Sequence, residues 1–274
     1  MVDFGCGDFR LSRAFQGQAS ELYGIDNWLA SNYHRASPPG ARFYYASVDK
    51  APFSTGSFDT VICTEVLEHV DSPEAVLQEC FRVLRGGGHL VLSIPFNFFV
   101  HGAPNDYRRY TIYGLERLVR AQGLELVEYS FVGNSFYALL NGLVTWMGFR
   151  KGNRVGRALG STVVACANIV GLLGLRLSGK SDLRRDTSAA INDRTNPLGY
   201  VLAATKPGQD DGVPKVESEI VVCPDCHGSL DFHPDEIVCT SCHHAFRYYD
   251  GVPVLADRET LHLEHEATGE AVVF

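Results

Sequence analysis

Four cysteines near the carboxyl end of the chain have the spacing of a metal site. They are Cys223, Cys226, Cys239 and Cys242, two Cys-x-x-Cys pairs with twelve residues between the pairs. Thiolates on two facing turns can converge on one tetrahedral zinc ion and leave it no open position. Such a site is structural, because metal binding supplies folding energy to a segment too small for its own core. We therefore expect structural Zn²⁺ here, with four reduced cysteines and no metal as the alternative.

The first nine residues, MVDFGCGDF, are typical of a loop that binds a nucleotide-like cofactor. Gly5 and Gly7 allow a tight turn whose backbone can lie against a ligand, directly after a strand-like stretch that holds Asp3. Asp26 follows about twenty residues later, where a carboxylate can accept both ribose hydroxyls. Either a dinucleotide or S-adenosylmethionine (SAM) could use this arrangement. The dinucleotide fingerprint wants a third glycine where this chain has Arg10, which argues against a dinucleotide.

Three polar side chains are candidates for a general base. His69 lies in LEHV after an apolar run, and His101 and Asp106 lie in the segment HGAPNDYRRY. The same segment supplies the candidate substrate-binding residues Tyr107, Arg108 and Arg109. The two guanidinium groups would suit an anionic substrate such as a phosphorylated or carboxylated sugar. The alternatives are that His69 has only a structural role and that the segment is a salt-bridged surface loop.

Alternating strand and helix patterns must position these residues. Strands are expected at residues 1–4, 21–25, 41–47, 58–63, 89–96, 124–133 and 199–207. Helices are expected to start near residue 10, to cover 71–88 and to cover 111–123. Asp71 or Ser72 would cap the second helix and Gly86–Gly88 end it, while Thr111 and Gly123 would bound the third. The alternation predicts an α/β fold with a doubly wound, mostly parallel, seven-stranded sheet, which binds ligands at the carboxyl ends of its strands.

Taken in order, these motifs resemble the class I SAM-dependent methyltransferases, the broad group that includes the type-11-like enzymes. VDFGCGDF is similar to the family's glycine-rich first motif and YGIDNW to its second. The stretch from ASVDKAPF to LVLSIP resembles the middle of the family almost continuously. The resemblance covers roughly residues 1–206 apart from an apolar insertion, and it implies SAM as the cofactor.

The resemblance also implies a role for individual residues. The implied SAM site contains Asp3, Gly5, Gly7, Asp26, Asn27, Asp49, Thr64 and Glu65. Asp26 would bind the ribose, Asn27 or Trp28 would lie beside the adenine, and Asp49 near its amino group. Thr64 and Glu65 would lie at the methionine end. Phe9 departs from the family, because many members have a glycine there, so the loop near the cofactor's carboxylate could be reshaped. Members usually have some tens of residues before the first motif, so we expect a start assigned too late or a truncated chain.

The cysteine segment resembles the zinc-ribbon family of small methyltransferase activators, including its closing DGVPVL. Those partners stabilise methyltransferases, and here the ribbon would be fused to one. The implied organisation is a methyltransferase domain at 1–206 with an apolar helical insertion at 134–196, a linker at 207–217, a zinc ribbon at 218–256 and a charged tail at 257–274.

The net charge of −8 and the lack of a basic-aromatic stripe weigh against nucleic acid as a partner. The paired cysteines fit a reducing cytoplasm better than secretion. Two apolar segments flanked by basic residues lie within 134–185, and each is shorter than the roughly twenty residues that span a bilayer. They are interpreted as a helical lid or a homodimer surface, with peripheral contact to a membrane as the alternative.

The sequence therefore predicts a cytoplasmic SAM-dependent methyltransferase with a fused structural zinc ribbon. Its expected substrate is a small molecule or glycan-type metabolite, with oxygen as the expected acceptor atom. The alternative from another class is a non-catalytic methyltransferase-like scaffold that binds a partner through its ribbon.

Overall fold

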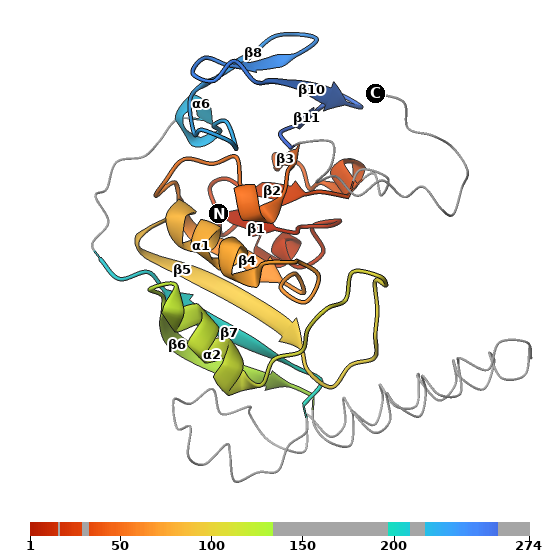
Figure 1. The fold of residues 1–274 in the computed structure, drawn as a ribbon, viewed down its shortest axis with the longest axis vertical. Helices are drawn as coiled ribbons and strands as arrows, with labels where there is room; N and C mark the ends of the chain where they lie inside the picture. Colours follow the sequence, from red (N-terminus) through yellow and green to blue (C-terminus); the bar gives the residue numbers. More distant parts are fainter. Residues whose placement is uncertain (16, 29–32, 134–196, 209–216, 257–274) are drawn as a thin grey trace, which may run out of the picture.

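One continuous mixed sheet runs through the chain (Figure 1). The computed structural model describes residues 1–15, 17–28, 33–133, 197–208 and 217–256. Strand order is β6-β7-β5-β4-β1-β2-β3-β11-β10-β9-β8. The first seven strands in this order come from the expected methyltransferase region, and the last four come from the cysteine segment. The mostly parallel, seven-stranded α/β sheet that the sequence predicts is confirmed.

The strands of the amino-terminal sheet are β1 (Val2–Phe4), β2 (Tyr23–Asp26), β3 (Arg42–Tyr45), β4 (Phe58–Thr64), β5 (Leu84–Pro95), β6 (Glu125–Val132) and β7 (Gly199–Thr205). Strand β1 lies between β2 and β4 and is parallel to both. Strands β3 and β5 continue the parallel sheet on either side, whereas β7 is antiparallel to its neighbours β5 and β6. The carboxyl ends of β1 to β5 therefore meet at one edge, where the loops that carry most of the candidate site residues begin.

Two helices of the amino-terminal region follow the expected capping rules. Helix α1 (Pro73–Val83) starts at Ser72, whose Oγ accepts the Ala75 N–H at 3.3 Å. Helix α2 (Ile112–Ala121) starts at Thr111, whose Oγ1 accepts the Gly114 N–H at 3.2 Å. The expected end of the first of these helices at Gly86–Gly88 is wrong. Helix α1 stops at Val83 because β5 begins at the next residue and pairs with β4.

The helix expected from residue 10 is also wrong over the residues described. Only a 3-10 turn, Ser12–Phe15, follows the glycine loop, and further 3-10 turns cover Tyr33–Ala36 and Val48–Lys50. The chain enters the first turn through Phe9, which has a left-handed backbone with φ of 57°. That turn reverses the chain sharply before a regular helix can start.

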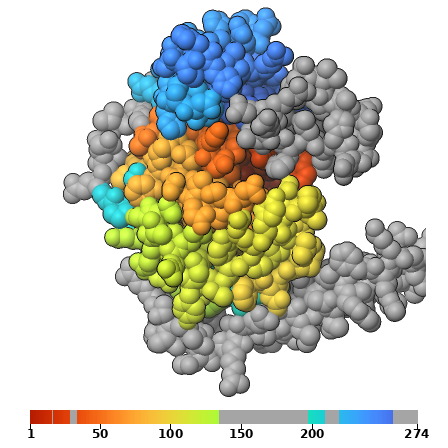
Figure 2. Space-filling model, in the orientation of Figure 1, coloured from red at the N-terminus to blue at the C-terminus, as the bar shows by residue number. Residues whose placement is uncertain are grey.

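The cysteine segment forms a small antiparallel unit on the edge of the larger sheet. Its elements are α6 (Glu217–Ile220), β8 (Leu230–Phe232), β9 (Ile237–Cys239), β10 (Ala245–Tyr249) and β11 (Val252–Val254). Strand β11 pairs in parallel with β3, and the Leu255 N–H donates to the Tyr45 carbonyl at 2.7 Å. On the other side of the contact, the Val222 N–H donates to the Pro52 carbonyl at 2.9 Å. Figure 2 shows this unit seated directly on the amino-terminal strands.

The two parts share one hydrophobic core. Phe53 lies at its centre, with ring centroids 5.0 Å from Phe58 and 5.9 Å from Tyr23 in edge-to-face contacts. The same buried cluster includes Val221 and Ile237 of the cysteine segment. Because β3 would otherwise be an exposed edge strand, this contact also covers a surface prone to unwanted pairing.

Several expectations lie outside the described residues. They concern the apolar insertion at 134–196 with its lid, dimer or membrane role, most of the linker, and the tail at 257–274. Among the residues that the structure describes, no helix has the length and apolar character needed to cross a membrane.

Phe9, the residue that replaces a family glycine, points into a small apolar cluster. It is fully buried, and its ring makes an edge-to-face contact with Phe43 at 6.1 Å. The ring lies over Gly24 of β2, where an added Cβ would be 2.3 Å from Phe9 Cζ and 2.8 Å from Cys6 Sγ. The Phe9 ring therefore occupies the space that a side chain at position 24 would need, and the glycine there leaves that space free.

Gly24→Ala is expected to destabilise the chain by about 1–3 kcal/mol, because the new methyl group overpacks the Phe9 ring. Denaturant unfolding measures the change. The matched control is Gly114→Ala, whose Cβ would lie 3.4 Å from Thr111 Oγ1 within α2 and should be neutral or stabilising. In the Phe9→Ala background the cost of Gly24→Ala should shrink, since the two sites are in contact. Additive effects would contradict the packing described.

Candidate functional site

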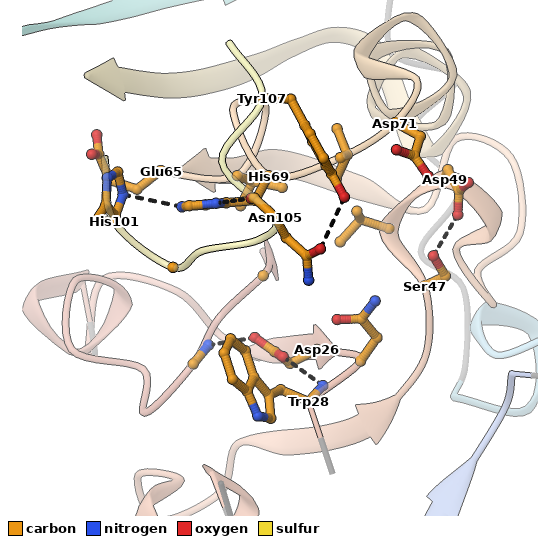
Figure 3. Close-up of a pocket in the computed structure, with 17 residues that line it drawn as sticks. Asp26, Trp28, Ser47, Asp49, Glu65, His69, Asp71, His101, Asn105 and Tyr107 are labelled. Carbon is orange, nitrogen blue, oxygen red and sulfur yellow. Dashed lines mark hydrogen bonds between the residues drawn. The ribbon is translucent and has the colours of Figure 1, made fainter. Parts of the chain in front are cut away.

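A cavity of about 530 Å³ opens at the carboxyl ends of the parallel strands (Figure 3). Nine of the predicted site residues line it: Gly5, Gly7, Asp26, Asn27, Asp49, Glu65, His69, His101 and Tyr107. Asp3, Thr64, Asp106, Arg108 and Arg109 are not among the lining residues. A cavity of this size falls within the range that small-molecule and cofactor sites occupy.

The glycine loop forms one wall of the cavity. Gly5 and Gly7 have positive φ of 69° and 50°, which a residue with a side chain adopts only at a cost. An added Cβ at Gly5 would lie 2.5 Å from Val66 Cγ2 across the loop. Glycine is thus required both by the turn and by the close approach of the neighbouring loop.

Asp26 connects the glycine loop to the end of β2. Its Oδ2 accepts the Gly7 N–H at 3.0 Å and its Oδ1 accepts the Trp28 N–H at 2.9 Å. The same carboxylate lines the cavity, as Figure 3 shows. Each carboxylate oxygen has further acceptor capacity, so the ribose hydroxyls of a cofactor could still donate to it.

Glu65 and Asp49 lie on other sides of the cavity. Glu65 directly follows β4 in the left-handed region, with φ of 55°, and its Oε1 accepts a hydrogen bond from the Ser93 hydroxyl at 2.7 Å. Strained non-glycine backbone of this kind costs of order 1 kcal/mol and is often found at functional sites. Asp49 Oδ1 accepts from the Ser47 hydroxyl at 2.5 Å in the loop after β3.

Asp3 lies behind the cavity wall instead of lining it. Only 2% of its surface is exposed, and its Oδ1 has no hydrogen-bond partner among the described residues. The pKa of Asp3 is raised to about 7, chiefly by burial; a hydrogen bond with the Ser12 side chain opposes the shift and the nearby Asp26 carboxylate adds to it.

The loop after β5 is held in place from within. Arg109 binds both carboxylate oxygens of Asp106, with 2.8 Å between Nη2 and Oδ2, and this pairing keeps the pKa of Asp106 well below its usual range. The His101 N–H also donates to Asp106, at 2.9 Å. Arg108 donates to the Asp71 carbonyl at 2.7 Å and also to the Val70 carbonyl. Arg109 therefore holds the loop together from within, and Arg108 ties it to the segment before α1.

Two histidines and a buried glutamate meet at the inner end of this loop. His69 Nε2 and His101 Nε2 are 3.1 Å apart, and Glu68 Oε1 lies 3.6 Å from the first and 3.8 Å from the second. Glu68 is fully buried, and burial raises its pKa to about 8. Sequence reasoning treated Glu68 only as a structural neighbour of His69, because LEHV does not reveal that His101 folds back onto it.

Further cavity residues were not singled out from the sequence as site residues. They are Ser47, Val48, Val66, Val70, Asp71, Gly102 and Asn105. Most lie within two or three residues of a predicted one. Their positions at strand ends and in the loop after β5 were a usable signal, although their residue types suggest no particular chemistry.

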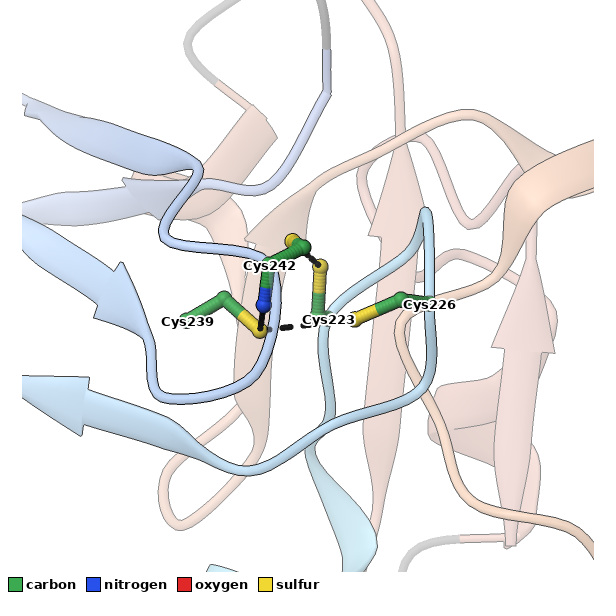
Figure 4. A group of neighbouring side chains, drawn as sticks. All are labelled: Cys223, Cys226, Cys239 and Cys242. Carbon is green, nitrogen blue, oxygen red and sulfur yellow. Dashed lines mark hydrogen bonds between the residues drawn. The ribbon is translucent and has the colours of Figure 1, made fainter.

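The four cysteines of the carboxyl-terminal segment converge (Figure 4). Their sulfur atoms all lie within 4.8 Å of one another, with 3.7 Å between Cys223 and Cys242 and 3.4 Å between Cys226 and Cys239. Four sulfur ligands about 2.3 Å from one zinc ion would be about 3.8 Å apart, so the donor set fits Zn²⁺. The two Cys-x-x-Cys pairs form turns of the same kind. In the first, the His227 peptide N–H donates to the Cys223 carbonyl, and in the second, the His243 peptide N–H donates to the Cys239 carbonyl. The cluster supports the expected structural zinc.

The raised pKa of Asp3 predicts a specific pH dependence of stability. The unfolded chain loses this proton near pH 4 and the folded chain only near pH 7, so the free energy of unfolding should fall as the pH rises through that window. Asp3→Asn cannot ionise there and should flatten the fall by on the order of 2–4 kcal/mol. Urea unfolding at several pH values measures this. Asp59→Asn, at an exposed aspartate, is the control. An unchanged pH profile in Asp3→Asn would contradict the burial argument.

The cysteine cluster predicts one tightly held zinc ion per chain. Metal analysis after dialysis against a weak chelator should find it in the native chain and in Cys80→Ala, a buried cysteine of α1 outside the cluster. Cys239→Ser should lose the zinc and expose amides of β8 to β11 to hydrogen exchange, because the ribbon depends on the metal. A zinc-free native chain with a protected ribbon would disprove this role.

Two family profiles match this chain in separate regions. Residues 2–92 match the family described as methyltransferase domain, and residues 218–251 match the family described as Trm112p-like protein. The first match ends within β5 and so includes the glycine loop, Asp26, Glu65 and His69. The second includes all four cysteines of the cluster.

Curated relatives match the amino-terminal region. A ubiquinone biosynthesis O-methyltransferase of Psychrobacter arcticus is 33% identical over 128 residues, which are 44% of this chain and 48% of the relative. One of Cupriavidus pinatubonensis is 29% identical over 153 residues, 47% of this chain and 61% of the relative. The chain therefore spans about half the length of the first of these relatives.

Solved structures that align with this chain share little sequence with it. The complex of the Haloferax volcanii Trm112 methyltransferase activator with a methyltransferase is 15% identical, covers 76% of this chain and 82% of that chain, and has a TM-score of 0.47. Haemonchus contortus phosphoethanolamine N-methyltransferase 2 with bound SAM is 15% identical. The match covers 76% of this chain and 48% of that chain, with a TM-score of 0.49.

The profile matches agree with the strand order, the glycine loop and the four-cysteine cluster. The cofactor that the first family implies is SAM, and the cluster indicates a structural zinc. The chain thus carries a domain of the methyltransferase family followed by a Trm112p-like region with a four-cysteine cluster.

Proposed function

We propose that this chain is a SAM-dependent methyltransferase that transfers a methyl group to an oxygen atom of a small molecule. The observation that carries the proposal is the cavity, in which the glycine loop and Asp26 face His69 and His101 across one space. One side has the donors and acceptors of a nucleoside site, and the other has groups that can act on a hydroxyl proton.

The cofactor would occupy the side formed by the ends of β1, β2 and β3. Gly5 and Gly7 leave room for it, the Asp26 carboxylate would accept the ribose hydroxyls, and Asp49 would lie near the adenine. Glu65 would lie at the methionine end, because it follows β4. When bound, SAM supplies an activated methyl group, so the chain has mainly to align the acceptor with it and exclude water.

The acceptor would lie against His69 and His101, with Glu68 buried behind the two rings. A hydroxyl group is a poor nucleophile until its proton is lost or shared, and this cluster offers the basic atoms for that step beside the cavity. Asp106 and Arg109 would act as positioning residues, since they hold the loop that carries His101. The structural bonds of Arg108 and Arg109 weaken the argument for an anionic sugar.

An acceptor with an apolar part agrees best with the exposed apolar side chains that lie next to His101 in the loop after β5. Phe98, Phe99 and Val100 are exposed, and Phe98 packs edge-on against His101 at 5.3 Å. The relatives to which this chain is similar are named as O-methyltransferases of ubiquinone biosynthesis, which supports an oxygen acceptor on a molecule with an apolar part. We therefore favour a phenol-type acceptor over the glycan-type metabolite that is the other candidate.

Calorimetric titration with SAM tests the proposal. The native chain should bind SAM, and Asp26→Ala should weaken binding by about 10- to 150-fold, the equivalent of one lost charge-assisted hydrogen bond of about 1.5–3 kcal/mol. Asp59→Ala, which changes an exposed aspartate on β4, should bind like the native chain. A folded native chain that does not bind SAM would reject the enzyme and favour a scaffold that acts through its ribbon.

A further inference from the structure

The hydrogen bonds of the two cavity histidines fix which ring nitrogen carries a proton. His69 Nδ1 lies 2.5 Å from the Asn105 carbonyl oxygen, which can only accept. His101 Nδ1 lies 3.3 Å from the Phe99 carbonyl oxygen and 3.4 Å from Asp106 Oδ2, which are also acceptors at neutral pH. Both Nδ1 atoms must therefore be donors. In neutral rings this leaves both Nε2 atoms without a proton.

Those two Nε2 atoms nevertheless face each other at 3.1 Å. The third atom in the group, Glu68 Oε1, belongs to a fully buried side chain whose two oxygens have no hydrogen-bond partner among the described residues. Three lone pairs that point at one small volume repel one another unless a proton or a metal cation lies between them. A buried carboxylate without a partner is costly for the same reason.

The spacing of the three atoms fits a metal ion. Nitrogen and oxygen ligands lie about 2.1 Å from a metal such as zinc, and at angles of 90–110° two ligands are then about 3.0–3.4 Å apart. The observed separations are 3.1, 3.6 and 3.8 Å. A small rotation of the Glu68 side chain would shorten the two longer separations, those from Glu68 Oε1 to the two nitrogens, to this range.

The surroundings of the histidines are those of metal ligands. Ligating histidines usually donate their other ring N–H to a backbone carbonyl or a carboxylate, which fixes the ring and raises its basicity. Asn105 and Asp106 provide these acceptors. The peptide N–H of Tyr107 donates to the Glu68 carbonyl at 2.8 Å, which ties the loop after β5 to the segment that holds the other two groups.

We propose that Glu68, His69 and His101 bind one divalent transition-metal ion at the inner wall of the cavity, separate from the ribbon zinc. The mixed imidazole and carboxylate set suits Zn²⁺, Mn²⁺, Fe²⁺ or Co²⁺. Three protein ligands leave coordination positions open toward the cavity. There the metal would bind the acceptor's hydroxyl oxygen and lower its pKa, so that the proton leaves to solvent and the alkoxide or phenoxide attacks the methyl carbon of SAM. The oxygen–methyl bond would form as the methyl–sulfur bond breaks, and S-adenosylhomocysteine would be the leaving group. This last step rests on the proposed methyltransferase function, but metal binding does not.

Cobalt titration of the full chain tests the metal site. The zinc-loaded chain is titrated with Co²⁺ and followed in the visible spectrum, where a nitrogen and oxygen site gives weak d–d bands. Cobalt in the cysteine cluster would instead give strong thiolate charge-transfer absorption. We expect one Co²⁺ per chain with weak bands only. Glu68→Gln and His101→Gln should each weaken this binding at least tenfold, whereas His89→Gln, at an exposed histidine of β5, should not.

A measurement on the native chain avoids the risk that a variant fails to fold. Bound Co²⁺ should shift and broaden the ring proton signals of His69 and His101 in the NMR spectrum of the native chain and leave those of His89 unchanged. The proposal is overturned if these signals do not respond, if saturation needs the thiolates, or if Glu68→Gln binds Co²⁺ like the native chain. SAM titration of the same samples separates the two proposals. A chain that binds SAM but no cobalt would support the methyltransferase function and contradict the metal site.

Discussion

The parallel alignment of β1 between β2 and β4 is the constraint on which the site depends. In register, Phe4 lies beside Ile25 on one side and Cys63 on the other, so the three strands end together. The glycine loop starts directly after β1, Asp26 is the last residue of β2, and Glu65 directly follows β4. The hydrogen bonds from Gly7 and Trp28 to Asp26 then hold the loop and the strand end as one unit. The cavity is therefore a result of strand order, and its side chains need only short loops to reach it.

The second side of the cavity is organised differently. The loop after β5 contributes His101 and Tyr107, and it is fixed by Asp106, Arg108 and Arg109, whose bonds stay within the protein. Charged residues here serve to orient the imidazole rings, and the two rings line the cavity while Glu68 is buried beside them. The polar segment HGAPNDYRRY is thus divided between residues that face the cavity and residues that hold them.

The sequence allowed the strands, the glycine loop and the cysteine cluster to be predicted, because each depends on local spacing. Contacts between distant segments could not be predicted. Phe9 and Gly24 compensate for each other across two strands, and Arg108 finds its acceptors near the start of α1. Gly86–Gly88 is a valid signal for a helix end, but the pairing of Leu84 with Phe58 starts β5 earlier. Glu68 and His101 are 33 residues apart in a sequence that gives no hint of their proximity.

The cysteine segment packs on the β3 edge and belongs to the same chain as that strand. This covalent connection lowers the interaction energy that the contact between the two parts needs. Two separate proteins would need enough interface energy to offset the entropy of association at cellular dilution. Residues of one chain meet at an effective concentration that reaches the millimolar range for short linkers, whatever the expression level. A few backbone hydrogen bonds around Tyr45 and Pro52 and one shared aromatic cluster then suffice. The ratio of the cysteine segment to the methyltransferase-family domain is also fixed at one, so neither part depends on the supply of the other.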